Sequence, residues 1–463
     1  MLLNRIARRA AGGVAVTAAD RRAAVRAIAD TLACMVAGQG DIATQAVRRA
    51  LAGPDGAADL VGGGRAPAPL AALVNGTAAH ALDFDDNFMP GMSHASAVLV
   101  PALLALGQGV SGADLVTAYL VGLEAQALVG QGVAPEHYVA GWHGTSTIGT
   151  VGTAAGCAHL LGLDHAGIAQ AMSLAVSMAS GMKGQFGTPA KPFHAGMAAR
   201  NAVEAAFLAR AGLTGREDIL ERSQGFGELM GGGEAAHWDI PGPDTPHVIA
   251  TAGLLPKIHP CCGSTHNAVD MVLALRRQHG FAARDVAEVV LTVGRANYLN
   301  LAYPQPVTAM EARFSMQYCV ALALVQDLLS LSDFTPEAVA RPHLRALLAR
   351  ISMQVMPLAK EKAEARPPHR ALIRLRDGRE LRASLAHARG SLQDPLDEAT
   401  RIAKLRDCFA YAGRRLDDAG LAALEGIDAL PDLAPLVALI TGPVQDQARA
   451  GRDAARPAAM HGR

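Results

Sequence analysis

The segment TIGTVGTAAGCAHLLG, residues 147–162, decides the fold. Its glycines at 149, 152 and 156 are three and four residues apart, so they lie on one side of a helix. Because glycine has no Cβ, another backbone can approach such a side closely. ADLVTAYLVGLEAQALVGQ, residues 113–131, has the pattern of a long and mostly apolar helix. Together these segments predict a core of closely packed helices.

Helical spacing continues on both sides of this segment. Apolar residues recur at helical intervals in residues 14–50, 67–82, 97–109, 165–181 and 194–212. The last two segments end at a glycine, which suits a helix C-cap. The N-terminus, MLLNRIARRAAGG, is basic and lacks the apolar core of a signal peptide, so we expect an ordinary first helix there.

The pattern changes after about residue 260. VAEVVLTVG, residues 286–294, is β-branched and alternating, which predicts a strand. RALIRLRDGRELRASLAHARG, residues 370–390, predicts a hairpin that turns at Asp-Gly. Helices are expected around these strands, at 262–280 and 311–330, and again at 397–413.

These patterns predict a mainly α protein with a large all-helical domain and a smaller α+β domain. We place the helical domain at residues 1–261 and 393–445, and the α+β domain at 262–392. Residues 446–463, rich in Ala, Arg and Gly, are expected to form a frayed tail.

The composition argues against several classes of protein. The chain has 463 residues with 42 Lys and Arg against 42 Asp and Glu, so its net charge of zero gives no sign of a nucleic-acid surface. We expect no membrane span, because no apolar run reaches the required length and the best candidate, residues 97–110, contains a proline. Six cysteines in this length do not resemble a disulfide framework. We therefore expect a soluble, cytoplasmic protein.

The densest polar cluster is HALDFDDNFMPGMSHAS, residues 80–96, between two apolar helices. It resembles a calcium loop, but Phe88 and His94 occupy the positions where that loop needs Gly and Glu. A magnesium–diphosphate motif would need a third Asp that is absent here. Two interpretations stay open: a solvated loop that caps helices, or the polar floor of a cleft.

Other candidates are scattered along the chain. His143 lies in a Gly- and Thr-rich turn, where the alternative is a structural histidine. Lys191 and Lys257 each precede an expected helix N-terminus, a position that favours anions and suggests carboxylate binding. Cys261 and Cys262 lie near two histidines, but adjacent cysteines rarely ligate one ion well, so we expect no metal and no other cofactor.

Taken together, the segments resemble the MmgE/PrpD family, which includes 2-methylcitrate dehydratases, cis-aconitate decarboxylases and iminodisuccinate epimerases. The resemblance runs nearly end to end. Its motifs, in order, are NGTAAHALDFDD followed by SHAS, GWHGTSTIGTVG, AKPFHAGMAARNAVEAAFLA, KIHPCCGSTH, FSMQYCVALAL and RGSLQDP. The form KPFHAG is closer to the decarboxylase and epimerase branches.

The resemblance implies a helical domain, an α+β lid, an active site between them and a homodimer. Its cleft positions fall on six residues here: Asp83 for substrate binding, and His94, His143, Lys191, Lys257 and Tyr318 for catalysis. The sequence also departs from the family. Ala95 and Gly144 stand where a proline often follows each histidine. Cys262 stands where a cis-aconitate decarboxylase is expected to have histidine, which counts against that activity.

The family's chemistry implies proton transfer at a carbon next to a carboxylate of a small di- or tricarboxylate. Lys191 and Lys257 would stabilise the carbanion-like charge. His143 or His94 would act as base, and the other histidine or Tyr318 as acid. We expect a cofactor-independent lyase of the dehydratase (hydro-lyase) type. The alternatives are decarboxylation, an epimerase or isomerase of an imino- or amino-dicarboxylate, and a decayed family member that only binds carboxylates.

Overall fold

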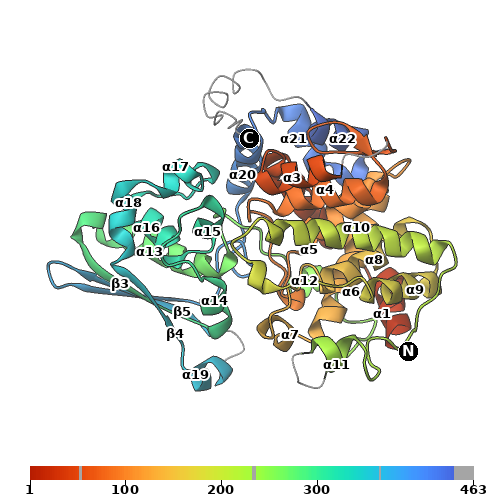
Figure 1. Ribbon diagram of the computed structural model, residues 1–463, viewed down its shortest axis with the longest axis horizontal. Helices are drawn as coiled ribbons and strands as arrows, with labels where there is room; N and C mark the ends of the chain where they lie inside the picture. Colours follow the sequence, from red (N-terminus) through yellow and green to blue (C-terminus); the bar gives the residue numbers. More distant parts are fainter. Residues whose placement is uncertain (52–54, 232–235, 364–366, 443–463) are drawn as a thin grey trace, which may run out of the picture.

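The computed structural model describes residues 1–51, 55–231, 236–363 and 367–442. It confirms a mainly α protein in two parts, one entirely helical apart from a short ribbon and one containing a small sheet (Figure 1). The helical part, as we define it, carries α1 to α12 and α20 to α22, and the smaller part carries α13 to α19 and β3 to β6. Each part has its own cluster of buried apolar side chains.

The helical part is built from both ends of the chain. Its helices are α1 (Leu2–Gly12), α2 (Ala18–Gly38), α3 (Ile42–Ala50), α4 (Ala68–His80), α5 (Ala95–Ala105), α6 (Gly112–Gln131), α7 (Glu136–Val139), α8 (Ile148–Leu160), α9 (His165–Val176), α10 (Ala190–Arg210), α11 (Phe226–Met230), α12 (Val248–Thr251), α20 (Glu398–Tyr411), α21 (Asp418–Glu425) and α22 (Ala434–Thr441). The ribbon pairs β1 (Ala58–Asp59) with β2 (Arg65–Ala66).

The glycines of α8 do what their spacing predicted. A Cβ on Gly152 would lie 2.5 Å from the backbone nitrogen of Gln126, and one on Gly156 would lie 2.7 Å from the carbonyl oxygen of Ala118. Both neighbours belong to α6. The two helices therefore pack backbone to backbone, and any larger residue at these glycines would force them apart.

A second close contact positions the site. A Cβ on Gly76 of α4 would lie 2.9 Å from the Cα of Gly196 in α10. Because the helices touch here, the loop after α4 and the first turns of α10 are fixed beside each other. That loop, residues 81–94, is the aspartate cluster, and the first turns of α10 carry Lys191.

The smaller part holds a four-stranded sheet in the order β4-β3-β5-β6. β3 runs parallel to β4 and antiparallel to β5, and β5 and β6 form the predicted hairpin around Asp377-Gly378. Its strands are β3 (Val286–Val293), β4 (Ile351–Val355), β5 (His369–Leu375) and β6 (Glu380–Leu385), and its helices are α13 (Gly263–His279), α14 (Arg295–Asn300), α15 (Ala309–Arg313), α16 (Met316–Val325), α17 (Pro336–Val339), α18 (Pro342–Leu348) and α19 (Leu358–Ala363).

Several expected elements differ in detail. The helix predicted over 14–50 is two helices, because Asp41 caps a new helix with its side chain. The helix predicted over 311–330 also breaks, since Ser315 caps α16. α9 ends at Val176, before the glycine expected to cap it. Strand β4 was not predicted at all.

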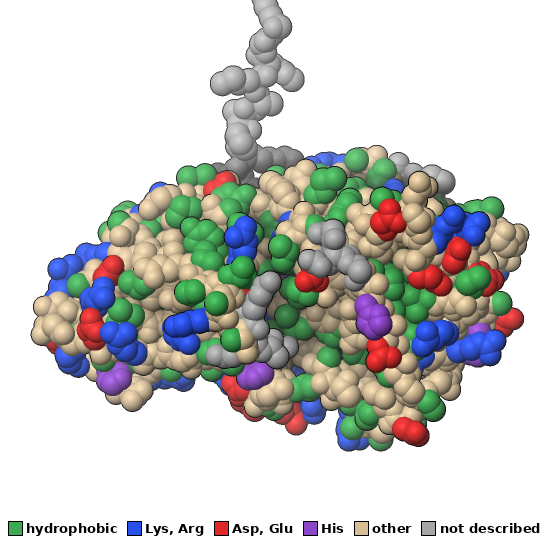
Figure 2. All heavy atoms as spheres, turned by 90° about the horizontal axis from the view of Figure 1, so that it is seen from below, with side chains coloured by type: hydrophobic (Ala, Val, Ile, Leu, Met, Phe, Trp, Pro, Cys, Tyr) green, Lys and Arg blue, Asp and Glu red, His purple; other side chains and the backbone are tan. Residues whose placement is uncertain are grey.

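The domain boundaries stay predictions, and the expected frayed tail, residues 446–463, lies outside the described residues. One expectation about apolar length was wrong, because α6 is long and apolar enough by composition alone to cross a membrane. In the structure 83% of that stretch is buried inside the protein, which is the position of a core helix. On the face shown in Figure 2, acidic and basic side chains are scattered together, as the balanced composition suggests.

Candidate active site

Asp83 lies at the centre of the site, in the loop between α4 and α5. Its backbone has φ +52°, a left-handed conformation that a non-glycine residue adopts only where the surroundings hold it. The ammonium group of Lys257 donates to the Asp83 carbonyl at 2.9 Å and lies 3.1 Å from carboxylate oxygen Oδ2. Lys191 donates to the other carboxylate oxygen at 2.5 Å. The two lysines thus hold this strained residue from two sides.

Two buried ammonium groups share the carboxylate of Asp83. Burial raises the pKa of Asp83, but Lys191 and Lys257 outweigh burial and hold that pKa well below its ordinary value. Burial lowers the pKa of Lys257, and the attraction of Asp83 and Asp85 reverses this, so its pKa is raised. Asp83 is therefore held between two ammonium groups, and the second buried carboxylate, Asp85, also balances their charge.

Two histidines flank Asp85. The Nδ1 atom of His80 lies 2.9 Å from the Asp85 carboxylate, and Nδ1 of His94 lies 3.2 Å from it. Nδ1 of His94 is also 2.8 Å from the carbonyl oxygen of Asp86, which only accepts. The proton of neutral His94 is therefore on Nδ1, and its Nε2 is left as the basic nitrogen.

Burial, helped by nearby positive charge, keeps His94 and His143 neutral. Burial, Lys257, His80 and Lys191 lower the pKa of His94 to about 3, although Asp85 opposes them. Burial, with the nearby ammonium group of Lys191 and neighbouring histidines, places the pKa of His143 well below its ordinary value. Both candidate catalytic histidines are therefore neutral near pH 7.

His143 is fixed by its backbone and by one ring nitrogen. Its amide donates to the Gly181 carbonyl at 3.0 Å, and its Nδ1 lies 3.1 Å from Nδ1 of His194. Nε2 of His143 is buried and has no partner in the described residues. An unpartnered buried nitrogen is costly, so this atom is a candidate to contact a substrate.

These side chains border a cavity of about 190 Å³ between the two parts. His94, His143 and Lys191 line it directly, while Asp83 and Lys257 lie behind them in contact with Lys191 and the loop. The two parts also meet here through Phe186 and Phe314, whose ring centroids are 5.5 Å apart. Five of the six residues picked from the sequence are thus brought to one place.

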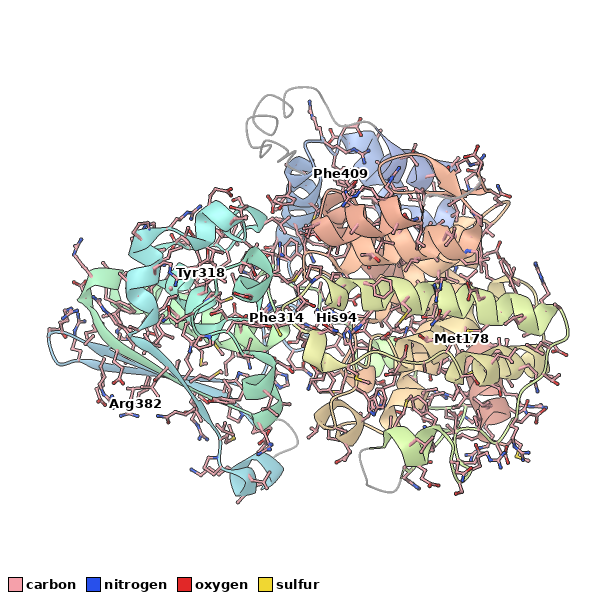
Figure 3. The ribbon with its side chains drawn as sticks, in the orientation of Figure 1. His94, Met178, Phe314, Tyr318, Arg382 and Phe409 are labelled. Atoms are coloured by element: carbon pink, nitrogen blue, oxygen red, sulfur yellow. The ribbon has the colours of Figure 1, made fainter. Side chains whose placement is uncertain are left out.

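Tyr318 is the exception. Its hydroxyl donates to the backbone carbonyl of Asp333 at 2.6 Å, and its ring packs edge-on against Phe334. Figure 3 shows it inside the smaller part, well away from His94. Burial also raises the pKa of Tyr318. The geometry does not support the predicted catalytic role, because the hydroxyl is committed to a structural contact in the core of the smaller part.

The smaller part adds a neutral polar wall that the sequence did not reveal. Ser264 lies in the first turn of α13, and the N-terminus of a helix favours anions. Its hydroxyl accepts from the side-chain amides of Asn297 and Asn300, each at 3.2 Å. Asn300 also donates to the Tyr138 hydroxyl. All four residues line the cavity, and Oδ1 of Asn300 has no partner in the described residues.

A metal ion fits this site poorly. Side-chain donor atoms of His80, Asp83, Asp85 and His94 lie within 4.8 Å of one another, and no other such group occurs in the described part of the chain. Asp83 is already paired with two ammonium groups, however, and these would repel a divalent cation. The Sγ atom of Cys261 already has a partner within the chain, because it contacts the Thr265 hydroxyl.

A mainly α, two-part fold with a charged cavity between its parts is typical of an enzyme. Comparison of the sequence with profiles of known families shows that the chain belongs to the MmgE/PrpD family. The profile of the family's N-terminal domain matches residues 13–239, and that of its C-terminal domain matches residues 259–423.

The similar proteins with a named activity are enzymes. Cis-aconitate decarboxylase of Mus musculus is 30% identical over 407 residues, which is 83% of this chain and 81% of that protein. The enzyme of the same name from Homo sapiens is 32% identical over 63% of each chain. That from Aspergillus terreus is 25% identical over 85% of each. These relatives support the prediction of a lyase that acts on a carboxylate. None of these three is named as a hydro-lyase, so that finer prediction is not confirmed.

Proposed function

We propose that this protein is a cofactor-independent lyase for a small tricarboxylate, and that decarboxylation of cis-aconitate is its first reaction to test. The observation that carries this proposal is the pair of ammonium groups on one buried carboxylate beside the cavity. The names of the relatives supply the substrate and the leaving group.

The ammonium group of Lys191, which lines the cavity, gives it affinity for anions. A substrate carboxylate that reaches Lys191 gains a charge-assisted hydrogen bond, worth about 1.5–3 kcal/mol. The wall formed by Ser264, Asn297 and Asn300 would hold a second carboxylate at the N-terminus of α13. A ligand with carboxylates at both ends therefore bridges the two parts.

The histidines supply the proton chemistry. When CO2 leaves, its bonding electrons stay on carbon, and the adjacent carboxylate spreads that charge toward Lys191. The carbon must then take up a proton, and Nε2 of His143 is the unpartnered nitrogen at the cavity. A bound polyanion also raises the pKa of both histidines, because negative charge favours their protonated forms.

Dehydration is the second candidate, and Cys262 favours it. This side chain lines the cavity where the family resemblance leads us to expect histidine in a cis-aconitate decarboxylase. In a dehydration, Nε2 of His94 would take the proton next to a carboxylate, and His143 would protonate the leaving hydroxyl. The arrangement of bases is the same, so only the products separate the two reactions.

The test is to incubate the purified protein separately with cis-aconitate, citrate and 2-methylcitrate in deuterated buffer, and to follow the products by NMR. Decarboxylation predicts CO2 and one solvent deuteron on the product carbon. Dehydration predicts a new double bond from the hydroxy acids and no CO2. The matched control is His143→Gln, which should be folded and inactive.

Other outcomes would contradict the proposal. Binding without turnover of any of the three acids would favour a decayed carboxylate-binding protein. Turnover of iminodisuccinate alone, with inversion of configuration, would favour an epimerase. The homodimer and the cytoplasmic location stay predictions, and light scattering of the purified protein tests the first of them.

A further inference from the structure

His143 and His194 form an unusual contact. Their two Nδ1 atoms lie 3.1 Å apart, within hydrogen-bond distance. Both imidazoles have pKa values below the ordinary range, that of His194 at about 4, chiefly because of burial. Two neutral imidazoles can make this contact only if one Nδ1 carries a proton and the other accepts it.

The position of that shared proton decides what His143 presents to the cavity. If His194 carries it, Nδ1 of His143 accepts, and the proton of His143 is on Nε2. If His143 carries it, Nε2 becomes a bare lone pair. Because Nε2 is the buried, unpartnered atom of His143, a residue that lines the cavity, the first state is an acid toward substrate and the second is a base.

The surroundings hold the pair rigidly. His194 follows Lys191 by three residues on α10, so both side chains lie on the same face of the helix. Its carbonyl accepts from the Ser146 hydroxyl at 3.2 Å. Gly181 has φ +112°, and a Cβ there would lie 2.8 Å from Ser146 and 3.4 Å from the ring of His194. The ring is therefore enclosed, and His194 as a whole residue is 6% exposed against 1% for His143.

We propose that His194 relays a proton to His143 during turnover. The inference rests on the proposed function, because decarboxylation consumes one proton in every cycle. At rest, His194 carries the shared proton and His143 carries its own on Nε2. The carbon that loses CO2 takes the Nε2 proton, Nδ1 of His143 takes the shared proton from His194, and Nε2 of His194 takes one from water. This moves one proton from water to carbon and leaves each ring as its other tautomer. After the product leaves, the shared proton returns to Nδ1 of His194, Nε2 of His194 gives its proton to water and Nε2 of His143 takes one from water, which restores the resting state.

The charged groups around the pair favour this direction. Lys191 and His80 face both rings, and His94 faces His143 as well. An ammonium group close to both imidazoles disfavours a resting imidazolium, so a proton lost by His143 must be replaced as it leaves. Without a relay, His143 would become an imidazolate beside the cavity, and an imidazolate is much higher in free energy than a neutral ring.

The decisive variant is His194→Asn. The asparagine amide puts a hydrogen-bonding atom where Nδ1 was, so it still orients His143, but it cannot pass a proton through a ring. We expect kcat with cis-aconitate to fall by about 10²-fold while KM changes little. The control His369→Asn removes a buried imidazole on β5, outside the site, and should leave turnover unchanged. Wild-type kcat in His194→Asn would show that His194 only orients, and would overturn the relay.

A second measurement needs neither a variant nor activity. Nitrogen-15 NMR of histidine-labelled protein reports which nitrogen of each imidazole carries the proton. The relay predicts that resting His143 is protonated on Nε2 and His194 on Nδ1. A proton on Nδ1 of His143 would overturn it. If the wild type turns over none of the acids, the proposed function fails by itself, and this NMR result still decides the state of the pair.

Discussion

Two buried lysine–aspartate clusters lie on opposite sides of the aspartate loop, and they differ in how their charges balance. Lys404 of α20 pairs with Asp30 of α2 at 2.7 Å and donates to the carbonyl of Phe84 in the loop. At Asp83, by contrast, two lysines share one carboxylate. Each ion is buried in both clusters. In one cluster a single ammonium group pairs with a single carboxylate and supports the loop, and in the other two ammonium groups share one carboxylate beside the cavity.

The pKa values of the two aspartates express this difference. Burial raises the pKa of Asp30, and the single partner Lys404 does not offset it. Burial acts on Asp83 in the same direction, but two ammonium groups reverse the result. A buried pair with one ammonium group and one carboxylate supports the structure, whereas two ammonium groups on one carboxylate can also attract the carboxylate of a ligand.

The largest effect should come from breaking the pair of Lys404 and Asp30. Lys404→Met leaves the Asp30 carboxylate buried and unpaired, so the free energy of unfolding should fall by about 3–5 kcal/mol. Urea denaturation of the wild type and the variant measures this. The folded fraction should keep near-normal turnover, because Lys404 does not reach the cavity. Equal stability of the two proteins would contradict the structural role.

Breaking the cluster at Asp83 should reduce activity strongly and stability only a little. Lys191→Met removes the charge that faces the substrate, and kcat/KM should fall by about 10²–10³-fold, as it does when one stabilising donor is lost. Asp83 keeps Lys257, so the loss of stability should be smaller than in Lys404→Met. Steady-state kinetics and urea denaturation of both variants make the comparison, which fails if the two variants show the same profile.

Acid should lower the free energy of unfolding through the buried His94. The pKa of His94 is about 3 in the folded protein against about 6.5 when unfolded, so its contribution is present above pH 6.5 and is lost as the pH falls toward 3. The slope from this one histidine approaches about 1.4 kcal/mol per pH unit. Unfolding free energies between pH 4 and 7 measure it, and His94→Asn should reduce the slope. An unchanged slope would contradict a neutral buried His94.

The smallest effect is expected at Tyr318. Tyr318→Phe removes only the hydrogen bond to the Asp333 carbonyl, so stability should fall by about 1 kcal/mol and turnover should stay near the wild-type value. Thermal unfolding and kinetics test both. A large loss of activity without loss of stability would restore the catalytic role predicted from the sequence.

Much of the fold followed from local pattern. Gly152 and Gly156 predicted a close helix contact because their spacing is a property of one helix. The Asp377-Gly378 turn likewise fixed its hairpin. Strand β4 escaped prediction because it is short, pairs only with β3, and has mostly exposed or partly exposed residues that give weak alternation.

The site was only partly predictable. Asp83, His94, His143, Lys191 and Lys257 stood out as polar residues between apolar helices, and a family resemblance grouped them. His80 and His194 lie in the same quoted motifs but were given no role, because their roles depend on ring-to-ring contacts that no spacing reveals. Asn297 and Asn300 reach the cavity only through the docking of α14 beside α13.

The central claim is that Lys191, at the cavity wall, and Lys257, behind it, attract the carboxylates of a tricarboxylate. Calorimetric titration with tricarballylate, a saturated tricarboxylate that has no double bond and no hydroxyl to lose, tests it directly. We predict that the wild type and Lys404→Met bind with similar affinity. Lys191→Met should bind at least about tenfold more weakly, the effect of losing one charged hydrogen bond, and Lys257→Met should bind more weakly than the wild type because it loses a nearby positive charge. Equal affinity in all four proteins would contradict the account.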